Sequence, residues 1–116
     1  MYSRGDIVLI PVPFSDLSAS KKRPVLVISN NSHNKTNQDM IVVAVTSNLA
    51  QPGIHISTND MIKGQLPKPS IIRSDKIYTL DQAIVVKNIA CVSDVVLKSV
   101  KASVISLISE ESEIQM

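Results

Sequence analysis

The chain has a single cysteine, Cys91, so no disulfide bond can form within it. Chains without disulfides are typical of reducing compartments, and we therefore expect a cytoplasmic protein. With one cysteine and two histidines, the sequence has no zinc-ligand spacing, and its three glycines form no phosphate-binding loop. No metal or cofactor is predicted. The apolar neighbours of Cys91 predict a buried, inert thiol rather than a nucleophile.

Aromatic residues and long apolar runs are also scarce. The aromatic residues are Tyr2, Phe14 and Tyr78, so the core has to be built from valine, isoleucine and leucine. No apolar run approaches the about 20 residues that cross a bilayer, and the N-terminus lacks a signal pattern, so no membrane association is expected. With 116 residues, 44% of them apolar and 19% charged, the chain has the balance of one globular domain.

The charges are distributed unevenly along the chain. The three glutamates, Glu110, Glu111 and Glu113, lie within the last seven residues. Without that tail the chain carries 12 basic and 7 acidic residues, a net charge of +5. A basic body suits a polyanionic partner such as nucleic acid, although charge alone does not establish one.

Several segments rich in β-branched residues predict strands. The longer ones cover residues 6–12, 23–30, 40–46 and 70–80. The third of them is almost continuously apolar, which predicts a central strand buried on both faces. Residues 55–57 have the composition of a short edge strand. Two apolar pieces, 83–86 and 89–92, flank Lys87 and Asn88, where the sequence favours a tight turn.

Three segments are predicted to be irregular because turn-forming and polar residues dominate them. The first is 14–22. The second is 30–39, which holds four asparagines and no apolar residue. The third is 59–69, where Gly64 and two prolines leave room for no more than one helical turn.

The last element is predicted to be a helix. Apolar residues from Val96 to Ile108 recur at the i, i+3/i+4, i+7 spacing of one helical face. Ser93 can cap the N-terminus of this helix, and Asp94 favours its positive end. The pattern predicts a helix over about 93–109.

Short strands followed by one amphipathic helix are typical of a mainly β fold, either a small barrel or a curled sheet with a packed C-terminal helix. We expect one domain over residues 1–109, followed by an acidic, flexible tail over 110–116.

Four motifs follow one another in a fixed order. They are RGDIVL at 4–9, KRPVLVIS at 22–29, IVVAVTS at 41–47 and IIRSDKIYTLD at 71–81. The first three resemble the R-G-[DE]-[IV], R-P-x-L-V-[IVL] and V-x-x-[AP]-[IV]-T-[SA] strands of the MazF/PemK family of toxin ribonucleases. The fourth resembles the V-R-x-D-Q-x-R-T-[IL]-D segment of its Kid/PemK branch. The similarity covers nearly the whole chain.

The resemblance implies a small SH3-like twisted β-barrel that forms a two-fold homodimer. It implies a sequence-preferring endoribonuclease that cleaves single-stranded RNA, usually mRNA. It also implies neutralisation by a co-encoded antitoxin with an acidic flexible segment, and contact with operator DNA only through that antitoxin.

RNA can be cleaved without a metal when its 2′-OH attacks the adjacent phosphate, which leaves a 2′,3′-cyclic phosphate and a 5′-OH. This route needs a base, a cation for the phosphorane charge and a proton source for the leaving 5′-oxygen. Arg23 is the first candidate for the phosphate, because a guanidinium grips two oxygens and stays charged. Lys21 and Lys22 would add attraction to the RNA backbone.

Further candidates follow from the last two motifs. The Thr46 hydroxyl can donate to phosphate or position the 2′-OH, with Ser47 as a weaker neighbour. Arg73 and Asp75 have period-two spacing and should point to one face of their strand. The resemblance implies an acid/base pair. Asp75 suits the base, whereas Arg73 better suits a second phosphate clamp because its pKa lies far above 7. Lys76 adds charge beside them, and the general acid stays open.

Other positions depart from the family pattern. His33 and His55 match no family site residue and are interpreted as surface histidines. The family's first loop carries a G-x-E-x-x-G segment, whereas residues 15–20 are short and lack glycine. Lys76 and Tyr78 replace a glutamine and an arginine, so no cleavage sequence can be carried over, and Tyr78 can stack on a base or pack. A catalytically silent barrel that binds RNA or a partner peptide, and a structural barrel, remain alternatives.

Overall fold

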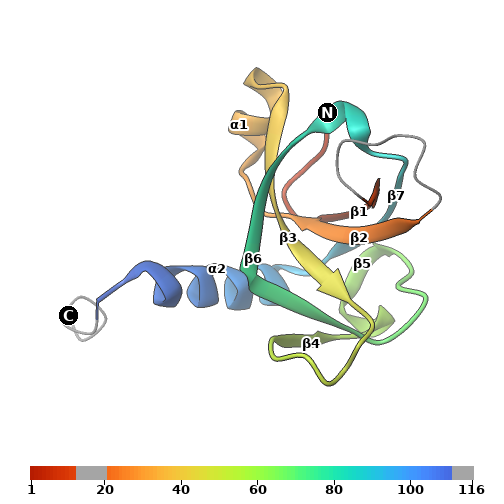
Figure 1. Cartoon of the computed structure of the whole chain (residues 1–116), viewed down its shortest axis with the longest axis vertical. Coiled ribbons are helices and arrows are strands. Elements are labelled where there is room, and N and C mark those ends of the chain that lie inside the picture. Colours follow the sequence, from red (N-terminus) through yellow and green to blue (C-terminus); the bar gives the residue numbers. More distant parts are fainter. Residues whose placement is uncertain (13–20, 111–116) are drawn as a thin grey trace.

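The computed structural model describes residues 1–12 and 21–110, which form one curled antiparallel sheet and two α-helices (Figure 1). The spatial order of its seven strands is β4-β6-β3-β2-β1-β7-β5. The strands are β1 (Asp6–Pro11), β2 (Lys22–Val27), β3 (Asp39–Thr46), β4 (Ile54–Ile56), β5 (Met61–Gly64), β6 (Ser70–Asp81) and β7 (Lys87–Val92). The helices are α1 (Asn31–Thr36) and α2 (Asp94–Ile108), and 3₁₀ turns cover Thr58–Asp60 and Gln82–Ile84. The predicted mainly β fold, a small twisted SH3-like barrel with a C-terminal helix, is confirmed.

The strongest strand predictions are confirmed. The β-branched segments form β1, β2, β3 and β6, and β3 lies inside the sheet between β2 and β6. The short edge strand predicted at 55–57 is β4, which pairs with β6 at one end of the sheet. Residues 14–20 of the first predicted loop lie outside the described residues.

The prediction of a loop over residues 30–39 is wrong, because residues 31–36 form helix α1. Asn30 caps the N-terminus of this helix, because its side chain accepts a hydrogen bond from the His33 N–H. Asn34 is buried, and its Nδ2 donates to the Ser29 carbonyl at 3.0 Å while its Oδ1 accepts from the Ser29 hydroxyl at 2.5 Å. Polar contacts therefore hold this helix, so no apolar period reveals it.

Two further boundaries differ from the prediction. Residues 61–64, within the segment predicted to be irregular, form β5, which pairs with β7. The tight turn predicted at Lys87 and Asn88 is absent from the described chain, because Lys87 begins β7 and pairs with Leu9 of β1. Pairing partners that are distant in sequence decide both elements. Within β7, Cys91 is half-buried, and this burial raises the pKa of its thiol.

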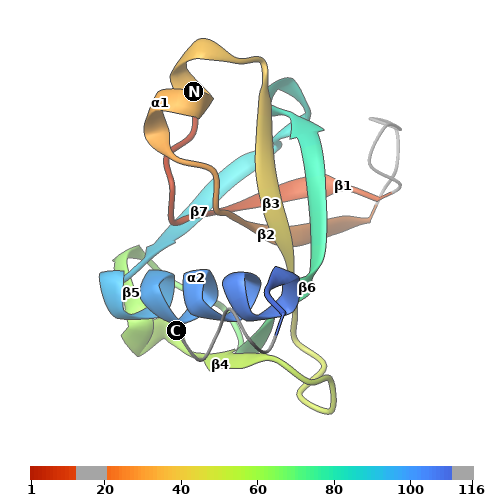
Figure 2. The ribbon, with the colours of Figure 1, turned by 90° about the vertical axis from the view of Figure 1, so that its left-hand side faces the viewer.

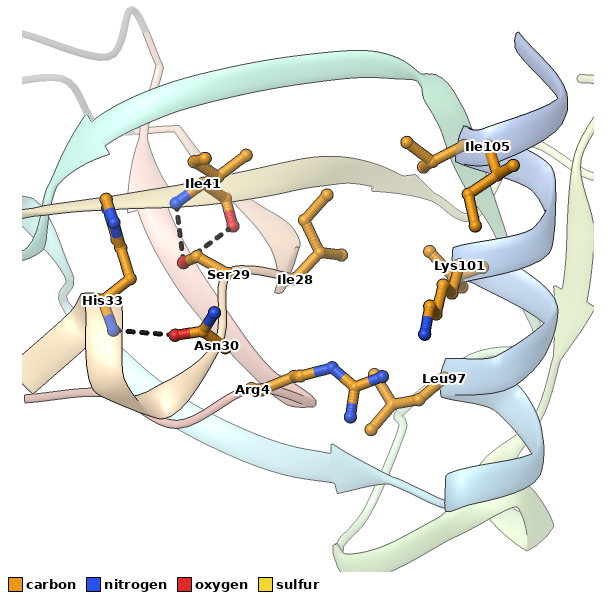
Figure 3. Close-up of a pocket in the computed structure, with 11 residues that line it drawn as sticks. Arg4, Ile28, Ser29, Asn30, His33, Ile41, Leu97, Lys101 and Ile105 are labelled. Carbon is orange, nitrogen blue, oxygen red and sulfur yellow. Dashed lines mark hydrogen bonds between the residues drawn. The ribbon is translucent and has the colours of Figure 1, made fainter. Parts of the chain in front are cut away.

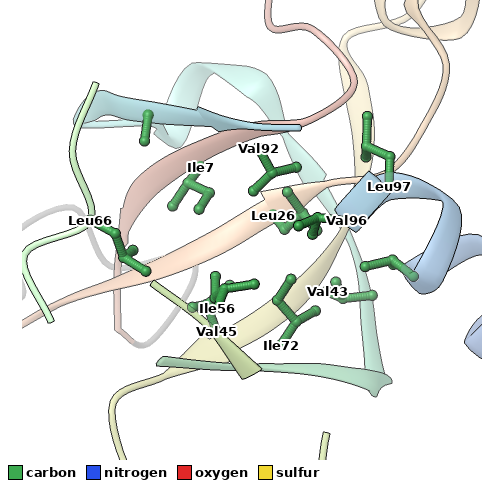
Figure 4. Close-up of a cluster of buried hydrophobic side chains, with 12 residues drawn as sticks. Ile7, Leu26, Val43, Val45, Ile56, Leu66, Ile72, Val92, Val96 and Leu97 are labelled. Atoms are coloured by element: carbon green, nitrogen blue, oxygen red, sulfur yellow. The ribbon is translucent and has the colours of Figure 1, made fainter. Parts of the chain in front are cut away.

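The core consists of two apolar clusters, one on each face of the curled sheet. The larger cluster lies inside the curl of the sheet, and α2 covers one side of it (Figure 4). It includes Leu26, Val43 and Ile72 from neighbouring strands and Val96 from α2. The second cluster lies on the opposite face of the same strands and contains, among others, Val25 and Val42. Alternate residues of one strand thus enter different clusters, as the pleat of a strand requires.

The predicted C-terminal helix is confirmed as α2. The Ser93 side chain caps it by accepting a hydrogen bond from the Val96 N–H at 3.4 Å. Val96, Leu97 and Val100 are buried against the sheet, and Figure 2 shows the helix crossing one side of it. The described helices include none that is long and apolar enough to cross a membrane. Residues 111–116, most of the predicted acidic tail, lie outside the described residues.

Candidate functional site

Three of the predicted site residues share one face of three adjacent strands. Val25 of β2 pairs with Ala44 of β3, and Ala44 pairs with Arg73 of β6. Residues in such a cross-strand row point to the same face. Arg23 and Thr46 are each two positions from this row along their own strands, so they point to that face as well. Val25 belongs to the cluster away from α2. We call this surface, with Arg23, Thr46 and Arg73, the site face.

Arg73 and Asp75 are in direct contact, as their spacing predicts. Arg73 Nε donates to Asp75 Oδ1 at 3.0 Å, and Nη2 donates to Oδ2 at 2.9 Å. The side chain of Arg73 is 15% exposed and that of Asp75 is 47% exposed. The hydrogen bonds from Arg73 hold the pKa of the Asp75 carboxyl below its ordinary value, and Asp75 raises the pKa of Arg73. The carboxylate is therefore ionised at neutral pH.

A bulge in β6 creates this arrangement. The register with β3 jumps from the pair Ala44 and Arg73 to the pair Val43 and Ile77. Ser74, Asp75 and Lys76 therefore have no partner on β3, and such extra residues re-aim side chains locally. Asp75 and Lys76 are exposed, whereas Ser74 is buried and its hydroxyl has no hydrogen-bond partner among the described residues.

Sequence analysis missed Gln51, which also binds Arg73. The Gln51 side-chain carbonyl accepts a hydrogen bond from Arg73 Nη1. Since Gln51 lies in the loop between β3 and β4, 22 residues from Arg73, no local pattern could have indicated the contact. An arginine has five N–H donors, and these three hydrogen bonds leave two of them for a substrate oxygen.

The same loop begins at Thr46. The Thr46 hydroxyl accepts a hydrogen bond from the Asn48 N–H at 3.1 Å, and the Asn48 carbonyl accepts from the Gln51 N–H at 3.2 Å. A hydroxyl that accepts still has its own hydrogen to donate. Gly53 ends the loop so close to β6 that a Cβ there would lie 2.3 Å from the Ile72 carbonyl oxygen. The loop is therefore fixed against β6 beside Arg73.

The remaining predicted contacts surround these groups. Lys21 and Arg23 are exposed at the start of β2, and Lys22 between them is half-buried. Ser47 is exposed immediately after Thr46. These residues supply the positive charge and hydroxyl groups that protein surfaces use to bind nucleic-acid phosphates.

A hollow lies on the other face of the sheet. It is bounded by α2, by β3 and by the segment that leads into α1 (Figure 3). Its floor is apolar, with Ile28, Ile41 and Leu97, and Arg4 and Lys101 reach over it from opposite walls. None of the predicted site residues lines it. The hollow is therefore separate from the site face.

The two histidines lie in different places. His33 is in α1 and lines the hollow. His55 is exposed in the middle of β4, where it pairs with Ile71 of β6, and Ile71 pairs in turn with Thr46. His55 therefore points to the site face, a placement that its position in the sequence does not reveal.

A curled antiparallel sheet with arginines, a hydroxyl and an ionised carboxylate on one face presents the kinds of group that nucleic-acid-binding surfaces use for phosphates. Residues 3–108 match the family model described as PemK-like, MazF-like toxin of type II toxin-antitoxin system. The chain belongs to this family, which confirms the resemblance seen in its four motifs.

Individual relatives agree with this assignment. Endoribonuclease MazF of Staphylococcus saprophyticus is 31% identical over 107 residues, which cover 90% of this chain and 88% of that protein. The MazE-MazF crystal structure from Deinococcus radiodurans has a TM-score of 0.70 at 20% identity and covers 95% of this chain and 97% of that one. A mycobacterial endoribonuclease in complex with its cognate antitoxin has a TM-score of 0.68 at 18% identity, covering 91% and 93%. At these identities the solved structures establish the fold alone.

Proposed function

We propose that the chain, an endoribonuclease of this toxin family, cleaves single-stranded RNA without a metal, by attack of the 2′-OH on the adjacent phosphate. The observation that supports this most directly is the cluster of Arg73, Asp75 and Gln51 on the same face as Arg23 and Thr46. The products are a 2′,3′-cyclic phosphate and a 5′-OH.

Asp75 is the base and Arg73 is a phosphate clamp in this mechanism. In the resting site the carboxylate neutralises Arg73, because the two form a bidentate ion pair. When Asp75 takes the 2′-OH proton it becomes neutral, and the charge of Arg73 is no longer compensated. That change coincides with the negative charge that develops on the phosphorane, so the clamp binds the transition state more strongly than the substrate.

Arg23 and Thr46 complete the phosphate site. Arg23 provides a second guanidinium from β2, which lies on the other side of β3 from Arg73. Thr46 donates its hydroxyl hydrogen to a phosphate oxygen or to the 2′-OH. Lys21, Lys22, Ser47 and Lys76 contact the RNA on either side of the cleaved bond. The lysines would contribute mostly salt-dependent affinity rather than rate.

The test is cleavage of a long single-stranded RNA by the purified protein in excess EDTA, with analysis of the fragment ends. Cyclic-phosphate and 5′-OH ends, lost in Arg23→Ala but retained in Lys98→Ala, would support the proposal. Lys98 is an exposed lysine of α2 and serves as a control for the loss of one positive charge. RNA that is bound but stays intact would instead support the catalytically silent barrel, which the short first loop at residues 15–20 favours.

The proposed assembly is a two-fold homodimer in which α2 of a second copy fills the hollow. Figure 1 shows the C-terminal half of α2 extending beyond the sheet, where Ile105, Leu107 and Ile108 are 48%, 55% and 76% exposed. An apolar helix end matches the apolar floor of the hollow. Its negative dipole end, followed by Glu110, matches Arg4 and Lys101 on the walls. Such a contact is isologous, as a two-fold axis requires.

The oligomeric state tests this assembly. In analytical ultracentrifugation, wild type should sediment as a dimer and Ile105→Glu as a monomer at micromolar concentration. Val95→Glu is the matched control, because Val95 is 74% exposed near the N-terminus of the same helix. A monomeric wild type, or a dimeric Ile105→Glu, would reject this interface.

We propose a co-encoded antitoxin with an acidic, flexible segment as the second protein partner. The basic body of the chain and the solved complexes of its structural relatives with antitoxins support this partner. Operator DNA would be contacted only through the antitoxin. Co-purification with the product of the adjacent reading frame, and loss of RNA cleavage in that complex, would test the pairing.

A further inference from the structure

The proposed mechanism has a base and two phosphate clamps, but it does not yet have a proton source for the leaving 5′-oxygen. The structure brings His55 to the place where one is needed. His55 lies at the edge of the sheet in β4, and Figure 1 shows β4 beside the lower half of β6. In the register of the sheet, His55 pairs with Ile71, which pairs with Thr46. The three residues form one row across the site face.

The row places the imidazole within reach of a phosphate held by Arg73. Adjacent strands lie about 4.8 Å apart, and diagonal neighbours on one face of an antiparallel pair lie about 7–8 Å apart. Arg73 is the diagonal neighbour of His55, two positions beyond Ile71 on β6. His55 is exposed, and Ile54 and Ile56 on either side of it turn into the core cluster beneath α2. Ile54 and Ile56 thus hold β4 against the core, while the His55 side chain faces outward.

His55 and Asp75 flank Arg73 from opposite ends. Asp75 lies two residues after Arg73 along β6, and His55 lies opposite Ile71, two residues before it. In-line displacement at phosphorus places the attacking and leaving oxygens on opposite sides. A base at one end of the clamp and an acid at the other end fit that geometry.

We propose that His55 is the general acid that protonates the leaving 5′-oxygen, an assignment that rests on the proposed ribonuclease activity. The 2′-oxygen forms a bond to phosphorus as its proton passes to Asp75. The bond between phosphorus and the 5′-oxygen breaks as the imidazolium of His55 donates a proton to that oxygen. The products are the cyclic phosphate and the 5′-OH, and water returns a proton from Asp75 to His55 between turnovers.

Histidine is the side chain suited to this role near neutral pH. The other donors around the site hold their protons too tightly, since guanidinium, ammonium and hydroxyl groups lose them only well above pH 7. His33 is the chain's other histidine, but it lies in α1 beside the hollow on the opposite face. It therefore lies on the wrong face of the sheet to protonate the leaving oxygen.

A substrate with a better leaving group tests the assignment. Sulfur in place of the scissile 5′-oxygen leaves without protonation, so a defect in the general acid disappears on that substrate. After the cleavage site is mapped on a long RNA, two short RNAs that differ only in this atom are compared in single-turnover reactions. His55→Ala should cleave the oxygen substrate at least about 100-fold more slowly than wild type and the sulfur substrate within about threefold of wild type.

The comparison variants make the outcome specific. Asp75→Asn, which removes the base, should slow both substrates by similar factors, and Lys98→Ala, the control used above, should slow neither. His55→Gln, of similar size, should repeat the result of His55→Ala and guards against a folding defect. His55→Ala cleaving the oxygen substrate at the wild-type rate, or losing the same factor on both substrates, would overturn the His55 assignment alone. A wild-type protein that cleaves neither substrate would overturn the ribonuclease proposal together with it.

Discussion

Arg73 and Asp75 form a bidentate ion pair across the bulge of β6, with Nε and Nη2 donating to Oδ1 and Oδ2 at 3.0 and 2.9 Å. The base and the phosphate clamp of the proposed mechanism are therefore one unit. Gln51 binds the same guanidinium through Nη1 with a neutral acceptor. It can hold Arg73 in place when proton transfer removes the charge of Asp75.

Asp75→Asn should lower the cleavage rate much more than the affinity for RNA. The amide keeps the size of the side chain but cannot accept the 2′-OH proton, and a general base contributes about 10²- to 10⁴-fold to the rate. Single-turnover rates and filter-binding affinities at fixed salt measure the two effects. An unchanged rate would remove Asp75 as the base.

The pKa of Asp75 should lie below the ordinary value of about 3.9 and should rise towards that value in Arg73→Ala. The hydrogen bonds from Arg73 stabilise the ionised form. A lowered pKa contributes stability that is present above the ordinary value and is lost as the pH falls through the folded-state value. Carbon NMR titration of the Asp75 carboxyl measures the pKa directly. The same value in both proteins would show that the ion pair does not form in solution.

Gln51→Met should slow cleavage by about tenfold, the size expected when one hydrogen bond to a charged group is lost. Methionine keeps the length of the side chain but removes the strong acceptor. If Gln51 acts through Arg73, the same change should have no further effect in an Arg73→Ala background. Gln65→Met, an exposed glutamine after β5, is the control. Equal slowing in both backgrounds would mean that Gln51 acts by another route.

Asn34→Ala should lower the free energy of unfolding by about 1–3 kcal/mol, because the Ser29 hydroxyl and carbonyl lose their buried partner. Urea denaturation measures this loss. Asn59→Ala, at an exposed position of the 3₁₀ turn Thr58–Asp60, should change it by less than about 0.5 kcal/mol. Equal effects of the two substitutions would argue that the polar contacts of α1 contribute nothing to its stability.

The sequence by itself determined the elements whose signals are local. The segments that became β1, β3 and β6 are recognisable from their β-branched composition, and the apolar face of α2 follows a helical period that Ser93 precedes. β-Propensity and helical periodicity act within a residue or between near neighbours in the chain, so the sequence alone reveals them. The contact of Arg73 with Asp75 could also be predicted from the sequence, because the two residues are only two positions apart.

The tertiary structure alone decided the rest, because those features depend on residues far apart in the chain. Helix α1 is held by side-chain contacts of Asn34, β5 by its pairing with β7, and Arg73 by Gln51. Nothing in the sequence around His55 distinguishes it from an ordinary surface residue, and only strand pairing places it in line with Thr46. The register of a strand is set by its pairing with the neighbouring strands. That register decides the face of the sheet to which each side chain points.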